Sequence, residues 1–116
     1  MTYKKMLTDI DTAGASFVGT FMGEILLNYP KILEGEKEKT DFIQYMCKEY
    51  SNGWGITEDT MKTKCYAVLR IIEGQRVVDA LEHVSKCNPK KMDDFSIEDA
   101  KRLLEFINNG KVQLPY

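Results

Sequence analysis

Residues 12–23 read TAGASFVGTFMG, a stretch of twelve uncharged residues that contains three glycines. The apolar side chains in it have helical spacing, since Phe17, Phe21 and Ile25 recur at every fourth position. A helix that carries almost no polar residue has to be covered by protein on more than one side. The stretch therefore predicts the central helix of a helical bundle.

Small residues form a row along this predicted helix. Ala15, Gly19 and Gly23 lie at i, i+4 and i+8, on one face of it. Each glycine costs about 0.5–1 kcal/mol relative to alanine in a helix, and small rows let another backbone come close. We favour a tightly packed core helix, and the alternative is a surface for self-association.

The helical pattern extends outward from this stretch in both directions. The same spacing reaches back to Tyr3, and the helix is expected to end near Asn28, because a proline follows two residues later. Residues 31–39 are predicted to be a charged connector. A second helix is expected from about Thr40, stopped by the glycine-bearing loop 51–55.

The second half of the chain predicts further helices. Thr57 is expected to be the N-cap of a third helix. The apolar stripe changes face after Gly74, so that helix either breaks there or is covered on different sides early and late. Ser96 to Asp99 resembles a capping box at the start of a last helix, and Gly110 is expected to end it.

Composition agrees with a single all-α domain over residues 1–116, a compact bundle of four to five helices. The chain is 43% hydrophobic and 29% charged, values typical of globular proteins rather than disordered ones. Its formal net charge of −2 does not suggest a protein held mainly by phosphates. No stretch reaches the ~20 apolar residues of a membrane helix, and residues 1–11 do not resemble a signal peptide. We expect a cytoplasmic protein without a membrane partner.

The cysteines do not predict a metal site. Cys47, Cys65 and Cys87 lie 18 and 22 residues apart, and His83 is the only histidine. Zinc sites need closely spaced ligand pairs, which are missing here. No phosphate-binding loop is apparent either. We expect reduced thiols, no metal and no cofactor.

One alternative function is nucleic-acid binding. Residues 41–51 and 57–72 would form two helices joined by a turn at 52–55, as in a helix-turn-helix motif, with Lys62 and Lys64 near the start of the second helix. The acidic residues that open this helix and the length of the turn weigh against it.

A second alternative comes from Arg76 and His83, seven residues apart. The pair resembles the R-x4–6-H motif of HEPN-type ribonucleases, small helical bundles that join two such motifs across a dimer. The resemblance covers eight residues, and Val77 departs from the polar residue usual after the arginine. It implies that the histidine acts as general base and that the arginine holds the phosphate.

Trp54, between two glycines, is expected either to cover the core or to be an exposed anchor for a partner. The function we expect is that of a small non-enzymatic interaction or regulatory protein. It would bind a macromolecular partner or assemble with itself as a homo-oligomer. Phages and mobile elements encode proteins of this size, inhibitors of host defence complexes among them. The nucleic-acid regulator and the dimeric ribonuclease remain the alternatives.

Overall fold

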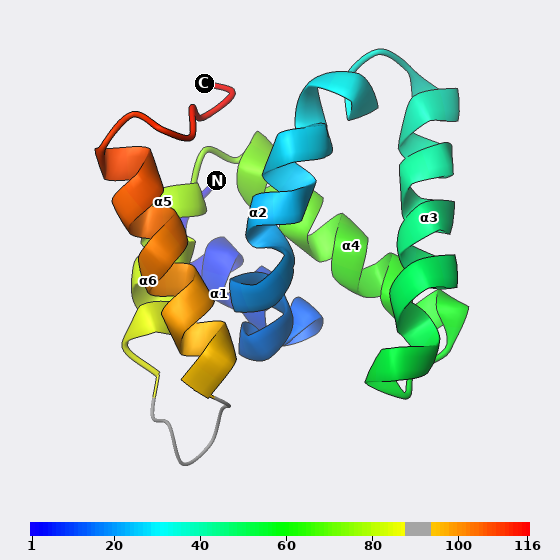
Figure 1. Cartoon of the computed structure of the whole chain (residues 1–116), viewed down its shortest axis with the longest axis horizontal. Coiled ribbons are helices and arrows are strands. Elements are labelled where there is room, and N and C mark those ends of the chain that lie inside the picture. The colour runs from blue at the N-terminus through cyan, green and yellow to red at the C-terminus, as the bar shows by residue number, and fades with distance from the viewer. Residues whose placement is uncertain (88–93) are drawn as a thin grey trace.

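A computed structural model describes residues 1–87 and 94–116, and in these it contains six helices and no strand (Figure 1). The helices are α1 Tyr3–Ala13, α2 Ala15–Ile32, α3 Glu36–Trp54, α4 Glu58–Glu73, α5 Val77–Ser85 and α6 Asp94–Asn108. The prediction of an all-α bundle is confirmed, but the predicted count of four to five helices is too low. The radius of gyration, 13.4 Å, is that of one compact globule of this length.

The extra helix arises from a break at Gly14. Its φ of +89° lies in the left-handed region, where residues with a side chain are strained. The Gly14 N–H donates to the carbonyl of Ile10 at 2.7 Å, which closes the last turn of α1. The sequence pattern concealed this break, because Ala13 and Phe17 on either side of it are both fully buried.

The connector between the second and third helices is shorter than expected. Helix α2 continues through Pro30 to Ile32, because Tyr29 and Ile32 are buried and continue its packing. Pro30 stands two residues from the helix end, where its missing N–H costs one backbone hydrogen bond. Helix α3 then starts at Glu36, not at Thr40.

The third predicted helix begins as expected and breaks. The hydroxyl of Thr57 accepts a hydrogen bond from the N–H of Thr60 at 3.1 Å, which confirms the N-cap. The helix ends at Glu73, and Gln75 adopts a φ of +61° before α5 starts at Val77. The change of apolar face after Gly74 therefore marks two separate helices.

The capping box predicted at Ser96 is wrong. Helix α6 begins at Asp94, so Ser96 lies inside it and is buried. Its hydroxyl lies 2.9 Å from that of Thr20, a hydrogen bond between α6 and α2. Gly110 has a φ of +75° just after the helix, as expected of a residue that ends one.

Helix α2 is the centre of the bundle, with α6 on one side of it and α3 on the other (Figure 1). It contacts each of the other five helices. Its side chains are accordingly buried over most of its length. The fully buried ones are Phe17, Val18, Met22 and Ile25. The interpretation of residues 12–23 as a core helix is supported by this packing.

Candidate functional site

A groove between α2 and α6 is the best candidate for a binding site. Its volume is about 320 Å³. Helix α2 forms one wall, α6 forms the other, and one residue of the C-terminal segment closes it. The lining residues are Gly19, Thr20, Gly23 and Leu27 from α2, Asp99, Arg102, Leu103 and Phe106 from α6, and Val112.

The glycines of α2 determine the shape of this groove. A Cβ atom on Gly19 would lie 2.5 Å from the backbone oxygen of Ser96, so only glycine lets the two helices approach this closely. At Gly23 a Cβ would meet only the side chain of Leu103, at 3.7 Å. The helix backbones therefore touch at Gly19, and one turn later they leave room for an open surface.

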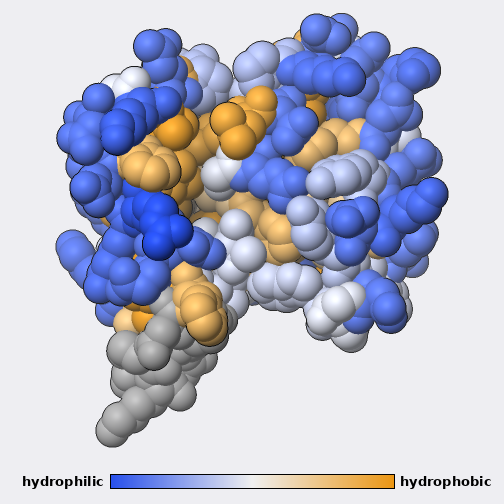
Figure 2. All heavy atoms as spheres, viewed as in Figure 1, coloured by the Kyte–Doolittle hydropathy of each residue, from blue (hydrophilic) through white to orange (hydrophobic). Residues whose placement is uncertain are grey.

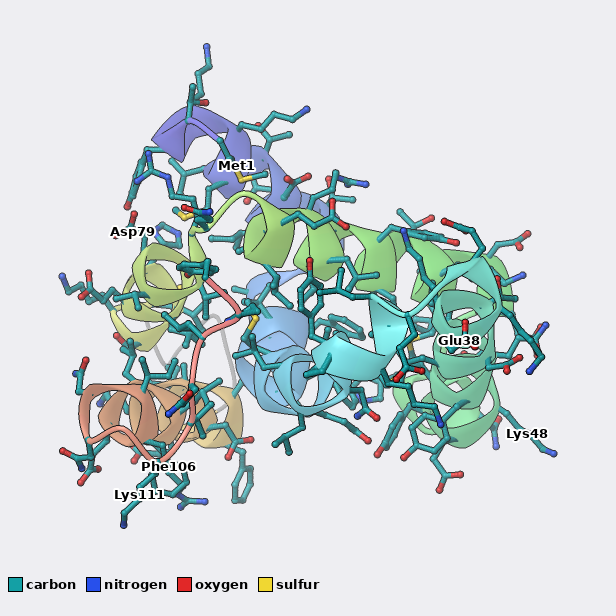
Figure 3. All side chains as sticks on the ribbon, turned by 90° about the horizontal axis from the view of Figure 1, so that it is seen from above. Met1, Glu38, Lys48, Asp79, Phe106 and Lys111 are labelled. Carbon is teal, nitrogen blue, oxygen red and sulfur yellow. The ribbon has the colours of Figure 1, made fainter. Side chains whose placement is uncertain are left out.

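Two large apolar side chains remain exposed on the helices that form the groove. Leu27 is 75% exposed, and Phe95, in the first turn of α6, is 82% exposed. Hydrophobic residues gather over the side of the molecule where α6 lies next to α2 (Figure 2). Phe106 and Lys111 lie together at the outer edge of α6 (Figure 3), and the Lys111 ammonium is 5.6 Å from the ring centroid.

The predicted row of small residues packs against another helix of the same chain. Gly19 is buried under α6, Gly23 lines the groove and Ala15 is half-buried. The close approach expected of such a row is thus made by α6 of the same chain, and we do not place a self-association surface on Gly19. Whether the chain forms a homo-oligomer remains a prediction.

Trp54 lies against the core at the end of α3. Its ring centroid is 5.6 Å from that of Phe17 and 5.4 Å from that of Phe21, both on α2. One third of its surface is exposed, 36%. These contacts fit the interpretation of Trp54 as a cover of the core.

The two lysines of the nucleic-acid hypothesis do not share a surface. Lys62 and Lys64 lie about 160° apart around α4. The Lys64 ammonium donates to the carbonyl of Ala13 at 2.6 Å and lies 5.8 Å from the ring of Phe17. It therefore closes the end of α1 instead of extending toward a phosphate.

The residues of the ribonuclease hypothesis both lie after the helix break, at the start and in the last turn of α5. Arg76 precedes α5, where its Nε donates to the carbonyl of Met1 at 3.0 Å and its Nη1 to Asp79 at 2.6 Å. His83 is half-buried in the last turn of α5. The left-handed Gln75 ends the continuous helix in which the pair would have extended the apolar stripe of α4, and Arg76 is already engaged in hydrogen bonds.

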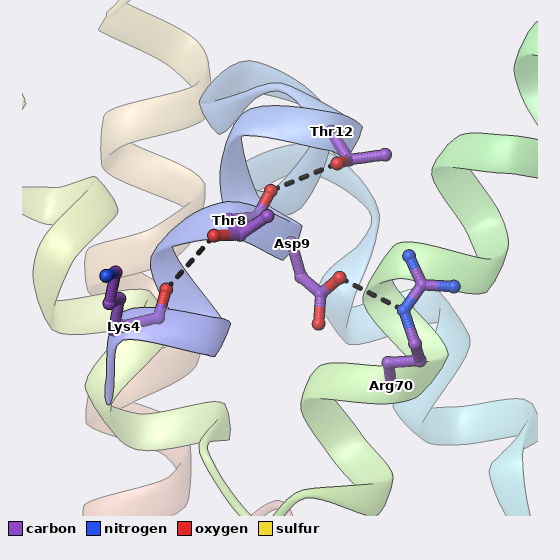
Figure 4. A network of polar contacts seen from close by, with 5 residues as sticks. All are labelled: Lys4, Thr8, Asp9, Thr12 and Arg70. Carbon is purple, nitrogen blue, oxygen red and sulfur yellow. Dashed lines mark hydrogen bonds and ion pairs between the residues drawn. The ribbon is translucent and has the colours of Figure 1, made fainter. Parts of the chain in front are cut away.

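A buried ion pair joins α1 to α4 and was not predicted (Figure 4). The Arg70 Nε donates to Oδ1 of Asp9 at 3.0 Å; the Asp9 side chain is 4% exposed and that of Arg70 is 44% exposed. The second carboxylate oxygen of Asp9 has no hydrogen-bond partner among the described residues. Asp9 is in phase with Met6 and Ala13 on the buried face of α1, which was the available signal.

A second polar cluster fills the space between α2 and α3. Oε1 of Glu24 accepts hydrogen bonds from the hydroxyls of Tyr45 and Tyr50, at 3.0 and 3.2 Å. The hydrogen bond to Tyr45, burial and the Glu24 carboxylate together raise the pKa of Tyr50 above its ordinary value. These three groups satisfy one another beside a cavity of about 260 Å³, and we assign them a role in joining the two helices.

The described residues contain neither a metal site nor a membrane-spanning helix. In residues 1–87 and 94–116, no group of histidine, cysteine and acidic side chains is arranged to hold a metal ion. In the same part of the chain, no helix has the length and apolar character needed to cross a membrane. The chain matches no protein family model, no curated protein and no solved structure with which it was compared.

Proposed function

We propose that this chain is a non-enzymatic interaction protein that binds a macromolecular partner, or a second copy of itself, through the groove between α2 and α6. The observation that carries the proposal is the exposure of Leu27 at this groove, 75% of its surface. Leu27 is a large aliphatic side chain on the central helix of the bundle, and its exposure to solvent does not stabilise the fold.

The energetic argument is that covering this surface is favourable. Burial of a leucine or phenylalanine side chain now in water contributes about 1.5–3 kcal/mol. Leu27 at the groove and Phe95 on α6 both offer this gain, and Leu103 and Phe106 line the groove together with Leu27. Contiguous exposed apolar surface with a charged rim is typical of protein-binding sites.

The geometry offers no comparable support for the two alternatives. The Lys64 ammonium and the Arg76 guanidinium, which each alternative requires for phosphate, are engaged with backbone carbonyls of the same chain. We therefore propose protein binding ahead of nucleic-acid binding or ribonuclease activity.

The experiment compares two substitutions of the same chemistry on the same helix. Leu27→Asp places a charge at the groove, whereas Leu33→Asp places one at the end of α2, where Leu33 is 63% exposed and lines no part of the groove. We expect Leu27→Asp to abolish self-association and the capture of protein partners, and Leu33→Asp to leave both intact. Equal binding by the two variants, or no binding by the wild-type chain, would contradict the proposal.

A further inference from the structure

Four residues form a stripe along the outer side of α6, called here the α6 stripe. They are Phe95, Asp99, Arg102 and Phe106, at i, i+4, i+7 and i+11. At 100° per residue all four fall within about 60° of one another around the helix. The order is aromatic, acidic, basic, aromatic, and its midpoint lies between residues 100 and 101.

Read in the opposite direction, the same order places each charge opposite the other sign and each aromatic residue opposite an aromatic residue. If two copies of α6 lie antiparallel about that midpoint, Phe95 of one copy faces Phe106 of the other, and Asp99 faces Arg102 of the other. Both contacts occur twice, as a two-fold axis requires. A parallel arrangement would instead place Asp99 against Asp99 and Arg102 against Arg102, so the charges favour the antiparallel arrangement alone.

Phe95, Asp99 and Arg102 have no such partners among the described residues of their own chain. In the described part of the chain, neither Asp99 nor Arg102 forms an ion pair, although their helix neighbours Glu98 and Lys101 do, at 3.7 Å. Phe95 is 82% exposed. The stripe thus presents opposite charges and the Phe95 ring to solvent, whereas Phe106 is half-buried beside the Lys111 ammonium.

The groove gives the aromatic ends a place to bind. Phe106 lines the α2–α6 groove together with Leu27. In the antiparallel arrangement, Phe95 of the second copy arrives at this end of the groove, where it would cover Leu27 and Phe106. An exposed ring in each copy therefore meets an open apolar groove in the other.

We propose that the α6 stripe is the interface of a two-fold symmetric homodimer, with antiparallel α6 helices. This inference rests on the proposed function and names its partner, a second copy of this chain. Asp99–Arg102 pairs set the register, and the aromatic residues with the groove provide the apolar contact.

The size of the face determines how tight this dimer is. Helix α6 has 15 residues and is therefore about 22 Å long, and with α2 beside it the face is about 20 Å wide. That gives about 450 Å² per copy, roughly half of the ~800 Å² found in a standard stable interface. The dimer should therefore be reversible, with a dissociation constant in the micromolar range.

The test reverses one charge at a time. Asp99→Arg gives a stripe with two bases, and Arg102→Asp gives a stripe with two acids, so each variant alone should dimerise more than tenfold more weakly than the wild type. Mixed together they should form a heterodimer, because every charged contact is then again between opposite charges. The double variant Asp99→Arg/Arg102→Asp should dimerise as the wild type does.

Matched controls lie on the same helix. Lys101→Asp and Glu105→Arg make the same charge reversals about 90–130° away from the stripe and should leave the dimer intact. Sedimentation velocity up to about 500 µM gives the masses, and circular dichroism checks that each variant is folded. The mixture makes the test independent of any general effect of a single substitution.

Each contrary outcome has a definite consequence. A wild type that stays monomeric throughout, single variants that dimerise as the wild type does, or a mixture that fails to form a heterodimer would overturn the dimer. If the chain is monomeric but Leu27→Asp abolishes binding of a different protein, the proposed function stands and this inference falls. If neither form of binding occurs, both fall.

Discussion

Gly19 and Gly23 provide a sharp test of the packing between α2 and α6, because the same substitution should have opposite effects at the two positions. In a helix, alanine is favoured over glycine by about 0.5–1 kcal/mol. At Gly23 the added Cβ would lie 3.7 Å from Leu103, an ordinary contact. Gly23→Ala should therefore raise the unfolding free energy by about 0.5–1 kcal/mol.

At Gly19 the new methyl group meets backbone. Its Cβ would lie 2.5 Å from the Ser96 carbonyl oxygen, 0.9 Å short of the 3.4 Å at which ordinary contact begins. The first turn of α6 would have to move by a comparable distance, which breaks the fit of Ser96 to Thr20. Overpacking of this kind costs about 1–3 kcal/mol and more when backbone must shift. After the helix-propensity gain, Gly19→Ala should lower the unfolding free energy by about 2 kcal/mol.

Urea denaturation followed by circular dichroism measures both effects. All proteins should be held at the same low concentration, near 2 µM, so that self-association adds as little as possible to the apparent stability. The result expected is a midpoint above that of the wild type for Gly23→Ala and below it for Gly19→Ala. Shifts of the same sign at both positions would show that α6 does not lie against Gly19 as described.

The ion pair and the thiols give three further predictions. Arg70→Met leaves the buried Asp9 carboxylate without a counter-charge and should lower the unfolding free energy by about 2 kcal/mol, less than for a fully buried pair because Arg70 is 44% exposed; no change in the urea midpoint would refute this. Burial raises the pKa of Cys65 to about 12 and also raises the pKa of Cys47, so iodoacetamide at pH 8 should modify the half-buried Cys87 first, as judged by mass spectrometry. Since the thiol of Cys65 has an ordinary pKa of 9.0 once unfolded, its contribution to stability is complete below pH 9 and is lost as the pH rises toward 12. Cys65→Ala should show a smaller loss of stability over that range.

The apolar spacing of the sequence predicted where helices lie, and it did so because burial is a property of a helix face. It located the buried side of α2 and the N-cap at Thr57 correctly. It could not locate the break at Gly14, because the core continues on both sides and the pattern stays in phase. The cap at Ser96 was predicted from the capping residues nearby in sequence alone, whereas the Ser96 hydroxyl bonds to Thr20, 76 residues away.

The candidate site depended on contacts between distant parts of the chain, which a single sequence does not supply. The sequence shows the row of small residues, but it does not show that α6 packs against Gly19. The groove appears only when α2 and α6 are placed side by side. The exposure of the aromatic residues of α6 could not be predicted either. In the sequence, Phe95 and Phe106 resemble any apolar residues of an amphipathic helix, whereas the structure shows that Phe95 is 82% exposed.

The measurement that tests the central claim most directly is the mass of the wild-type chain and of Leu27→Asp as a function of concentration, by sedimentation equilibrium. If the α2–α6 face binds a second copy, the wild-type mass should rise from 13.3 kDa toward twice that value between about 1 and 500 µM. Leu27→Asp should remain at 13.3 kDa over the same range. A wild-type mass that stays at the monomer value, or a variant that dimerises equally well, would contradict the binding of a second copy by this face.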